Sequence, residues 1–478
     1  MELTKTYEGR RFEIIYGSYT GMEKNAVDLV QSAVKRYVPY ILALYTAPTG
    51  KACPVYVGTK ESNPHIKKLL SEVELPADAT YVKVCGEGEQ QTVIVAGGSA
   101  AACYYAACYY AAVEFSDEYL PDIRRRRGWA NPYFIKPFID ELPAYEHLSR
   151  PLIKERGLWT WGHVIYDYRR YLDNMARLKM NKITVWNDFA PINGREFVDY
   201  AHSLGIRVIW GYSWMWDEKP EGVVTNPELR KAWKEKILAN YQGDYAHLGG
   251  DGIYFQTFTE TGVETIEGRN RAECAVEWVN EVAEALLALY PDLKIEFGLH
   301  ATSVKNSLEE IAKTDERLSI IWEDCGSFPY EYSASLVETA SETEDFSRKI
   351  ASLRGGKGFG AVLKGMSWLD WSSFAHQTGP YLLGVSENRE MEEKLALRRD
   401  ILRNQASFWL ENGEYAFRMI RLLAEESRGG AEICGLLEDG LFEEKLWLPA
   451  VLFANMLWDG ESDYRTLLGK ATRTENWE

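Results

Sequence analysis

The feature that most constrains the fold is an alternation of short apolar runs and amphipathic segments that begins near residue 156. The runs are apolar along their whole length, which is typical of parallel strands covered on both faces, and the segments between them have helical spacing. The pattern predicts eight strands, at residues 157–162, 182–186, 207–212, 252–258, 294–298, 318–322, 361–366 and 381–384. Eight strand–helix units in roughly 250 residues predict a (β/α)8 TIM barrel. A doubly wound open sheet is the structural alternative, and it explains the count of eight less well.

Two further regions flank the predicted barrel. Strands and helices also alternate before residue 145, where the pattern predicts a small α/β domain, and a Pro-rich linker follows. The chain beyond the barrel has helical patterning and predicts a helical extension. The expected domains are therefore an N-terminal α/β domain at 1–145, a catalytic barrel at 152–411 and a C-terminal extension at 412–478.

Composition excludes several classes of protein. A net charge of −17 argues against a nucleic-acid partner, and no apolar run is long enough to predict a membrane span. The N-terminus shows no signal-peptide pattern, so we expect a cytoplasmic location by default. The seven His are scattered and the seven Cys include no CxxC pair, so we expect neither a metal nor another cofactor. The sequence leaves open whether the chain forms a homo-oligomer.

Polar and aromatic residues gather where the predicted strands end. In a TIM barrel these carboxyl ends form the active site. Carboxylates there suit acid–base chemistry, amide and imidazole groups bind hydroxyls, and indoles stack on sugar rings. This pattern predicts a carbohydrate substrate. The candidate substrate contacts are Trp161, His163, Asn187, Asp188, Trp214, His300, Trp368 and Asp370.

Three carboxylates are candidates for catalysis. Glu260 follows the fourth strand, and Glu323 and Asp324 follow the sixth, so the two positions can face each other across a barrel mouth. Glycoside hydrolysis requires two such carboxyl groups on either side of the scissile bond. Since neighbouring residues of a strand point to opposite sides, we expect only one of Glu323 and Asp324 to enter the site. The sequence does not choose between them.

Residues 156–162 and 176–188 together resemble the opening of a superfamily of barrels. That superfamily includes the β-N-acetylhexosaminidases and the α-glucuronidases of glycoside hydrolase families 67 and 115, and the resemblance implies a small α/β domain before the barrel. Residues 259–262 and 268–273 are similar to the family 67 segment around its general acid, which implies that role for Glu260. A uronic acid substrate would need a cationic partner, for which the candidates are Arg156, Arg269 and Lys364.

The hexosaminidases carry an Asp-Glu pair after a His-x-Gly-Gly phrase. Residues 247–252 resemble that phrase, but Gly252 stands where the Glu would be, and we interpret residues 250–252 as a turn before the fourth strand. The sequence therefore predicts a glycosidase that removes a terminal sugar by carboxylate acid–base catalysis, with an α-glucuronidase-like activity as the main hypothesis. The alternatives are a β-N-acetylhexosaminidase-like enzyme and a non-catalytic carbohydrate-binding protein on the same scaffold.

Overall fold

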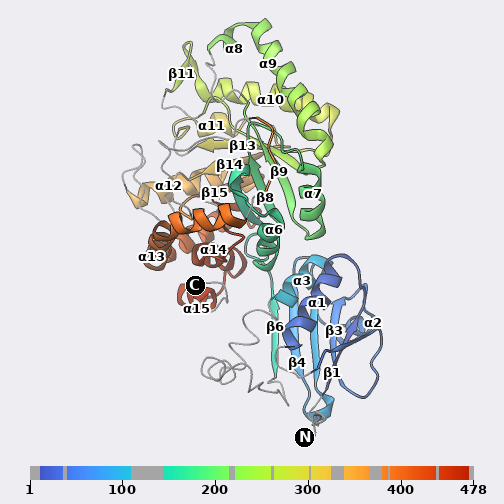
Figure 1. Ribbon diagram of the computed structural model, residues 1–478. Helices are drawn as coiled ribbons and strands as arrows, with labels where there is room; N and C mark the ends of the chain where they lie inside the picture. The colour runs from blue at the N-terminus through green and yellow to red at the C-terminus, as the bar shows by residue number, and fades with distance from the viewer. Residues whose placement is uncertain are drawn as a thin grey trace.

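The computed structural model describes residues 11–35, 40–108, 144–214, 221–259, 263–300, 303–324, 339–366, 379–385, 388–437 and 441–472. The described chain forms an N-terminal sheet domain and a larger barrel with its helices, stacked along the long axis of the molecule (Figure 1). In the described residues, no helix is both long and apolar enough to cross a membrane.

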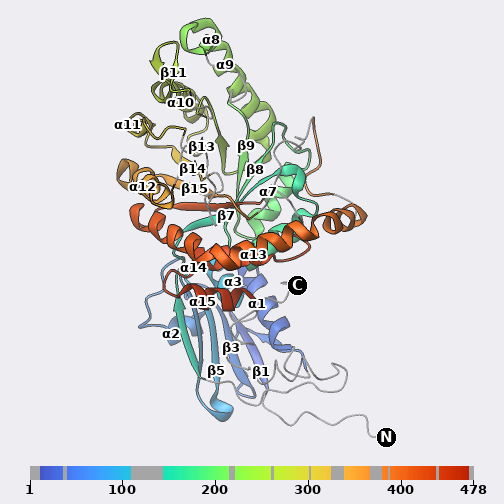
Figure 2. The same cartoon turned by 90° about the vertical axis from the view of Figure 1, so that its left-hand side faces the viewer.

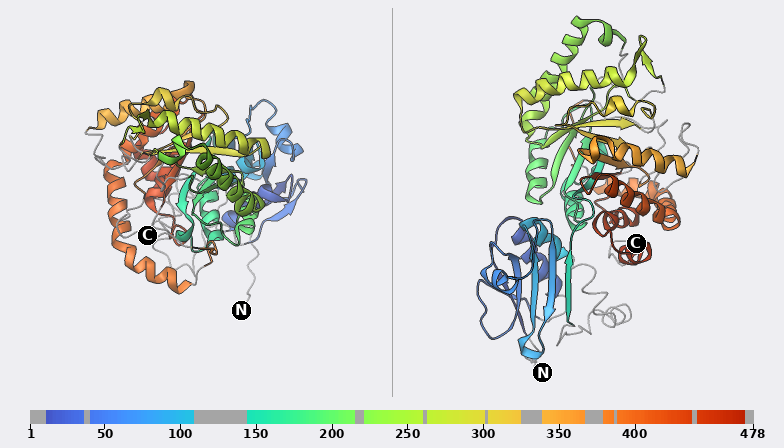
Figure 3. Two further views of the ribbon diagram at one scale, coloured as in Figure 1. Left: turned by 90° about the horizontal axis from the view of Figure 1, so that it is seen from above. Right: turned by 180° about the vertical axis from the view of Figure 1, so that it is seen from behind.

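The N-terminal domain is a six-stranded mixed sheet with the order β2-β1-β3-β5-β4-β6. Its strands are β1 (Phe12–Tyr16), β2 (Ala43–Tyr45), β3 (Cys53–Thr59), β4 (Thr80–Cys85), β5 (Thr92–Gly97) and β6 (Tyr145–Ser149). Its helices are α1 (Gly21–Lys35), α2 (Pro64–Leu69) and α3 (Ala100–Cys108), and α1 and α3 lie side by side on one face (Figure 1). The predicted α/β architecture of this region is confirmed, and β6 leads directly into the barrel (Figure 3).

Eight parallel strands close the barrel in the order β10-β13-β14-β15-β16-β7-β8-β9. They are β7 (Glu155–Trp161), β8 (Lys182–Trp186), β9 (Arg207–Gly211), β10 (Gly252–Phe255), β13 (Lys294–His300), β14 (Ser319–Glu323), β15 (Phe359–Leu363) and β16 (Glu432–Leu436). The short strands β11 (Thr265–Ile266) and β12 (Arg269–Asn270) form a separate hairpin after β10. The predicted TIM barrel is therefore confirmed.

Helices cover the outside of the barrel and begin at well-formed caps. Asp167 accepts hydrogen bonds from two backbone amides at the start of α6, and Thr339 forms a capping box with Glu342 at the start of α12. Asn226 followed by Pro227 begins α9 in the same manner. The helices are α6 (Tyr168–Arg177), α7 (Gly194–Ser203), α8 (Glu221–Thr225), α9 (Pro227–Asn240), α10 (Arg271–Leu289), α11 (Leu308–Ile311), α12 (Ala340–Ala351), α13 (Asn388–Glu426), α14 (Leu448–Trp458) and α15 (Tyr464–Thr472).

The eighth strand is not the predicted one. Residues 381–384 form no barrel strand, and Tyr381 makes only an isolated bridge with Pro191. β16 closes the barrel instead, pairing with β15 on one side and β7 on the other. The barrel therefore runs past the boundary expected at residue 411, which falls inside the long helix α13 (Figure 2). The helical extension expected at 412–478 is interrupted by β16 and continues with α14 only from Leu448.

Inside the barrel, side chains stack in layers, as is usual for this fold. The middle layer is a closed apolar cluster to which seven of the eight strands contribute a side chain: Trp159, Ile209, Tyr254, Ile321, Val362 and Cys434, with Trp186 above them. The eighth, β13, contributes Gly298, where a methyl group would lie 2.2 Å from the Tyr254 hydroxyl oxygen. Because side chains alternate along a strand, residues two positions further on project into the carboxyl-end mouth.

Candidate active site

Glu323 is the carboxylate at the centre of the barrel mouth. It is the last residue of β14, it is only 5% exposed, and it pairs in register with His300 of β13. One carboxylate oxygen accepts hydrogen bonds from the Tyr254 hydroxyl and the Gln256 amide. The other lies 3.1 Å from the ammonium nitrogen of Lys364. Three donors from two strand ends, those of β10 and β15, therefore hold this carboxylate in one orientation.

These contacts keep Glu323 ionised. Burial alone would raise the pKa of this carboxyl group, but Lys364, His300 and the Tyr254 hydroxyl outweigh burial, and the pKa is lowered. The pKa of His300 is also lowered, because burial and the charge of Lys364 outweigh the opposite effect of Glu323. At neutral pH the centre of the mouth thus holds an anionic carboxylate, a cationic ammonium and a neutral imidazole. An ionised carboxylate can act as a base, a nucleophile or a stabiliser of positive charge, but not as an acid.

Asp324 points to the opposite side of the strand. Its carboxylate accepts a hydrogen bond from the backbone amide of Lys364 at 2.8 Å, and its own amide donates to the carbonyl of Val362 at 3.2 Å. It is only 2% exposed. Of the two neighbouring carboxylates, Glu323 enters the mouth and Asp324 ties the ends of β14 and β15 together.

Aromatic side chains form the floor of the mouth. Trp161 packs edge-on against Trp159 and Trp186, with ring centroids 5.2 and 5.9 Å apart. Tyr254 packs edge-on against Trp159 and Trp186 in turn, at 5.9 and 5.7 Å. The same tyrosine donates to Glu323, so the aromatic floor and the carboxylate form one connected unit. Tyr254, Gln256 and Trp186 are site residues that the sequence analysis missed.

The chain after β10 is strained two residues before Glu260. Phe258 has a φ of 41°, a left-handed conformation that is costly for an aromatic residue. The buried guanidinium group of Arg271 donates to the Phe258 carbonyl at 2.7 Å and holds this turn. Glu260 lies outside the described residues, as do Trp368 and Asp370, so their roles stay predictions.

The remaining predicted contacts lie in different surroundings. His163 follows β7 in a short 3-10 turn and is half-buried, while Asp188 is exposed after β8. Asn187 is buried, and its side-chain oxygen accepts from the backbone amide of Phe189, which stabilises the turn after the strand. Trp214 is completely buried and stacks on Phe255 with centroids 3.5 Å apart, so it belongs to the core outside the barrel and presents no face to a sugar.

Two of the three cations proposed for a uronate lie away from the mouth. Arg156 is at the amino end of β7, buried against the rings of Trp458 and Tyr105 at the junction with the N-terminal domain. Arg269 pairs with Glu277 on the surface, at 2.8 Å. Lys364 is in the mouth, but its charge is paired with Glu323.

Comparisons with known proteins identify structures with the same fold. No family model and no curated protein matches the sequence. Among solved structures, a mutant β-hexosaminidase from Streptomyces plicatus in complex with its product GlcNAc has a TM-score of 0.52 at 11% identity, covering 97% of this chain and 90% of that one. A GH20 β-N-acetylhexosaminidase from Streptomyces coelicolor A3(2) has a TM-score of 0.50 at 12% identity, covering 97% and 91%. The predicted hexosaminidase-like arrangement of a small α/β domain before a barrel is confirmed for the fold.

The Gly-Gly-Asp phrase lies far from the mouth. It immediately precedes β10, at the amino end of the barrel, and Gly249 has a φ of 77°. The carboxylate of Asp251 accepts from the backbone amide of Val208 and contacts His202, both at 2.8 Å. Residues 250 and 251 therefore lie in a structural turn before the fourth strand, as we interpreted them, whereas Gly252 is the first residue of β10. The phrase is not part of the carboxyl-end mouth.

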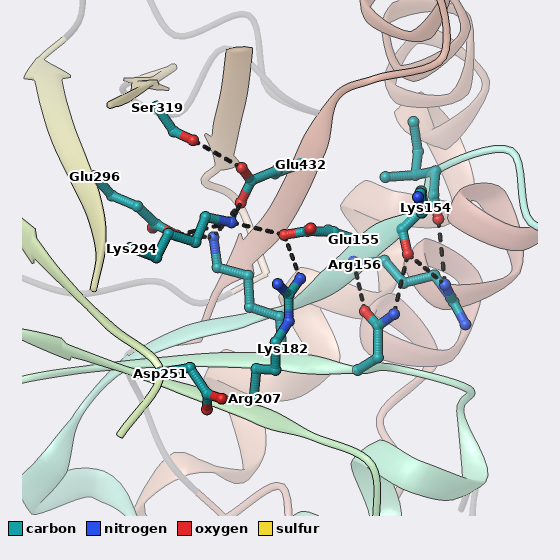
Figure 4. Close-up of polar contacts among 12 residues, drawn as sticks. Lys154, Glu155, Arg156, Lys182, Arg207, Asp251, Lys294, Glu296, Ser319 and Glu432 are labelled. Carbon is teal, nitrogen blue, oxygen red and sulfur yellow. Dashed lines mark hydrogen bonds and ion pairs between the residues drawn. The ribbon is translucent and has the colours of Figure 1, made fainter. Parts of the chain in front are cut away.

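The amino end of the barrel holds a second charged cluster (Figure 4). Lys182, only 2% exposed, lies 2.7 Å from Glu296 and 2.8 Å from Glu432. Lys294 joins the same glutamates to Glu155, Arg207 pairs with Glu155, and Ser319 donates to Glu432 at 2.9 Å. The charges of three cations and three anions balance here, so we interpret this cluster as an ion-pair network that stabilises the amino end of the barrel. In the described part of the chain, no three His, Cys, Asp or Glu side chains gather as a metal site.

Proposed function

We propose that this protein is a glycosidase that removes an uncharged terminal sugar from its substrate, with Glu323 as the ionised catalytic carboxylate. The observation that carries the proposal is the environment of Glu323. A buried, fully oriented anion lies at the carboxyl end of a TIM barrel, directly beside an aromatic floor. Glycoside hydrolysis needs such an anion opposite a proton donor, because positive charge develops on the sugar in the transition state.

The two carboxyl groups take different roles in this proposal. Glu323 faces the anomeric centre as nucleophile, base or stabilising charge, since its lowered pKa keeps it from donating a proton. Glu260 protonates the leaving oxygen, a role supported by its place after the strained turn at Phe258 and by the sequence resemblance.

Trp161 and Trp186 provide the surface beneath the sugar. The indole N–H of Trp186 is buried with no partner in the described structure, which suits donation to a hydroxyl or carbonyl group of the substrate.

The charge balance of the mouth favours an uncharged sugar. A uronate would bring a carboxylate next to Glu323, and among the described residues the one candidate cation that lies there is already paired with Glu323. Placing two anions together without a second cation is unfavourable in a buried site. The β-N-acetylhexosaminidase-like alternative therefore fits better than the α-glucuronidase-like hypothesis. The fold shared with hexosaminidases, one of them with bound GlcNAc, makes N-acetylhexosamine the first sugar to test.

The test is hydrolysis of a panel of aryl glycosides that includes N-acetylhexosaminides, other neutral glycosides and uronides. We expect turnover of a neutral member, a loss of at least about 100-fold in Glu323→Gln and a smaller loss in Asp324→Asn. The competing function, sugar binding without catalysis, predicts affinity for a neutral sugar with no turnover by any variant. Preferential cleavage of uronides, or full activity of Glu323→Gln, would contradict the proposal.

A further inference from the structure

We propose that Lys364 is the positioning residue of the site, holding the Glu323 carboxylate in its reactive orientation while Asp324 holds Lys364. This inference rests on the proposed function, because it assigns Lys364 to the same carboxylate. It also gives the two adjacent acidic residues separate tasks: one reacts inside the barrel and the other works through the backbone outside it.

The geometry of Lys364 supports this role. It directly follows β15, and its ammonium nitrogen lies 3.1 Å from the Glu323 oxygen that receives neither Tyr254 nor Gln256. Its backbone amide donates to Asp324 at 2.8 Å. Since the side chain is only 16% exposed, the ion pair is protected from solvent and from screening by salt. A long, flexible lysine is thus fixed at both its backbone and its charged end.

Within the described part of the mouth, Lys364 is the cationic partner of Glu323 at neutral pH. β10 contributes the Tyr254 hydroxyl, and β13 contributes His300, whose pKa is lowered. Asp324 is the anion on the same strand, facing outward. The other strand ends place Trp161, Trp186, Gly211 and Leu436 at the matching positions, none of which carries charge.

Removal of the ammonium group has a predictable effect on ionisation. Burial raises the pKa of the Glu323 carboxyl, and Lys364 is the largest influence that lowers it again. Without Lys364 this pKa rises, and the acidic limb of the pH–rate profile moves toward neutral pH. Lys364 also lowers the pKa of His300, so the imidazole becomes easier to protonate in the same variant. A residue that only filled space would leave the acidic limb of the pH–rate profile unchanged.

The experiment compares pH profiles of kcat/KM for wild type, Lys364→Met and Lys364→Arg on the neutral glycoside that the wild type cleaves. Lys357→Met is the matched control, because Lys357 is exposed at the other end of β15. We expect the acidic limb of Lys364→Met to shift upward by about one pH unit or more, with at least a tenfold lower plateau. The arginine variant restores the limb, and the control matches wild type.

A second variant keeps the test decisive if Lys364→Met folds poorly. Asp324→Asn weakens the anchor of the Lys364 backbone while leaving the ammonium group in place, and we expect the same shift with a smaller size. An unchanged acidic limb in both variants overturns the role of Lys364. Full activity of Glu323→Gln would overturn the proposed function instead, so the two failures are distinguishable.

Discussion

Replacement of Lys182 by methionine should destabilise the barrel severely without affecting its chemistry. Lys182 and Glu296 are 2% and 1% exposed, and the lysine bridges Glu296 and Glu432 at 2.7 and 2.8 Å. Its loss leaves three buried or half-buried anions, including Glu155, with the two remaining cations. Breaking one partner of such a network costs about 3–5 kcal/mol, because the stranded charge remains buried. At about 2–4 °C per kcal/mol, the melting temperature of the barrel falls by roughly 6–20 °C.

The pH dependence follows from the same cluster. Burial raises the pKa of Glu432, but Lys182 and Lys294 outweigh burial and lower it well below its ordinary value. The contribution of this group is therefore present above the unfolded-state pKa of about 4.3 and is lost as the pH falls below it. For Lys182 the pKa is raised, so its contribution would be lost only at strongly alkaline pH.

The assay is thermal unfolding followed by near-UV circular dichroism at several pH values. Lys231→Met is the control, since Lys231 makes only a long, exposed contact of 4.0 Å with Glu235 and should change stability by less than about 1 kcal/mol. The double variant Lys182→Met with Glu296→Gln removes one stranded charge and should recover part of the loss. A Lys182→Met barrel as stable as wild type, or a double variant less stable than the single one, would contradict the stabilising role of this ion-pair cluster.

Three further predictions test other parts of the structure. Burial raises the pKa of Glu443 to about 7. The stabilising contribution of this group is therefore fully present below about pH 4.3 and is lost as the pH rises to 7. Over that range, pH-dependent unfolding should show the free energy of unfolding of Glu443→Gln increasing by about 3 kcal/mol relative to that of wild type. Gly298→Ala places a methyl group 2.2 Å from the Tyr254 hydroxyl oxygen, so kcat should fall roughly 10- to 100-fold while circular dichroism shows a folded barrel. Trp214→Ala should cost about 3–5 kcal/mol in unfolding experiments with KM unchanged, whereas Trp161→Ala should raise KM; a KM effect at Trp214 would contradict its place in the core.

Much of the barrel could be predicted from the sequence, because seven of its strands are apolar runs followed by helical periodicity. The eighth could not. Residues 381–384 and 432–436 are both short apolar runs, and local pattern does not show which one pairs with β7. That choice depends on closure of the sheet, a long-range property that no short window of sequence contains.

The orientation of the two neighbouring acids was also beyond the sequence. A barrel strand is apolar on both faces, so Ser319–Glu323 carries no alternation that distinguishes inside from outside. Which of the two acids faces the inside of the barrel becomes clear only when the register of Glu323 with His300 and Val362 is known. Tyr254 and Gln256 were missed for the same reason, although they lie two and four residues after Gly252 and therefore fit one face of the strand. Trp214 was misplaced because an indole after a strand has the same pattern whether it faces a mouth or a core.

The most direct test of the proposed site is a crystal structure of the Glu323→Gln variant soaked with the neutral glycoside that the wild type cleaves, beginning with an N-acetylhexosaminide. We expect a sugar ring above Trp161 and Trp186, with its anomeric carbon facing residue 323 and its leaving oxygen facing Glu260. A sugar bound elsewhere on the molecule, or bound in the mouth with its anomeric carbon turned away from residue 323, would contradict the assignment of this site.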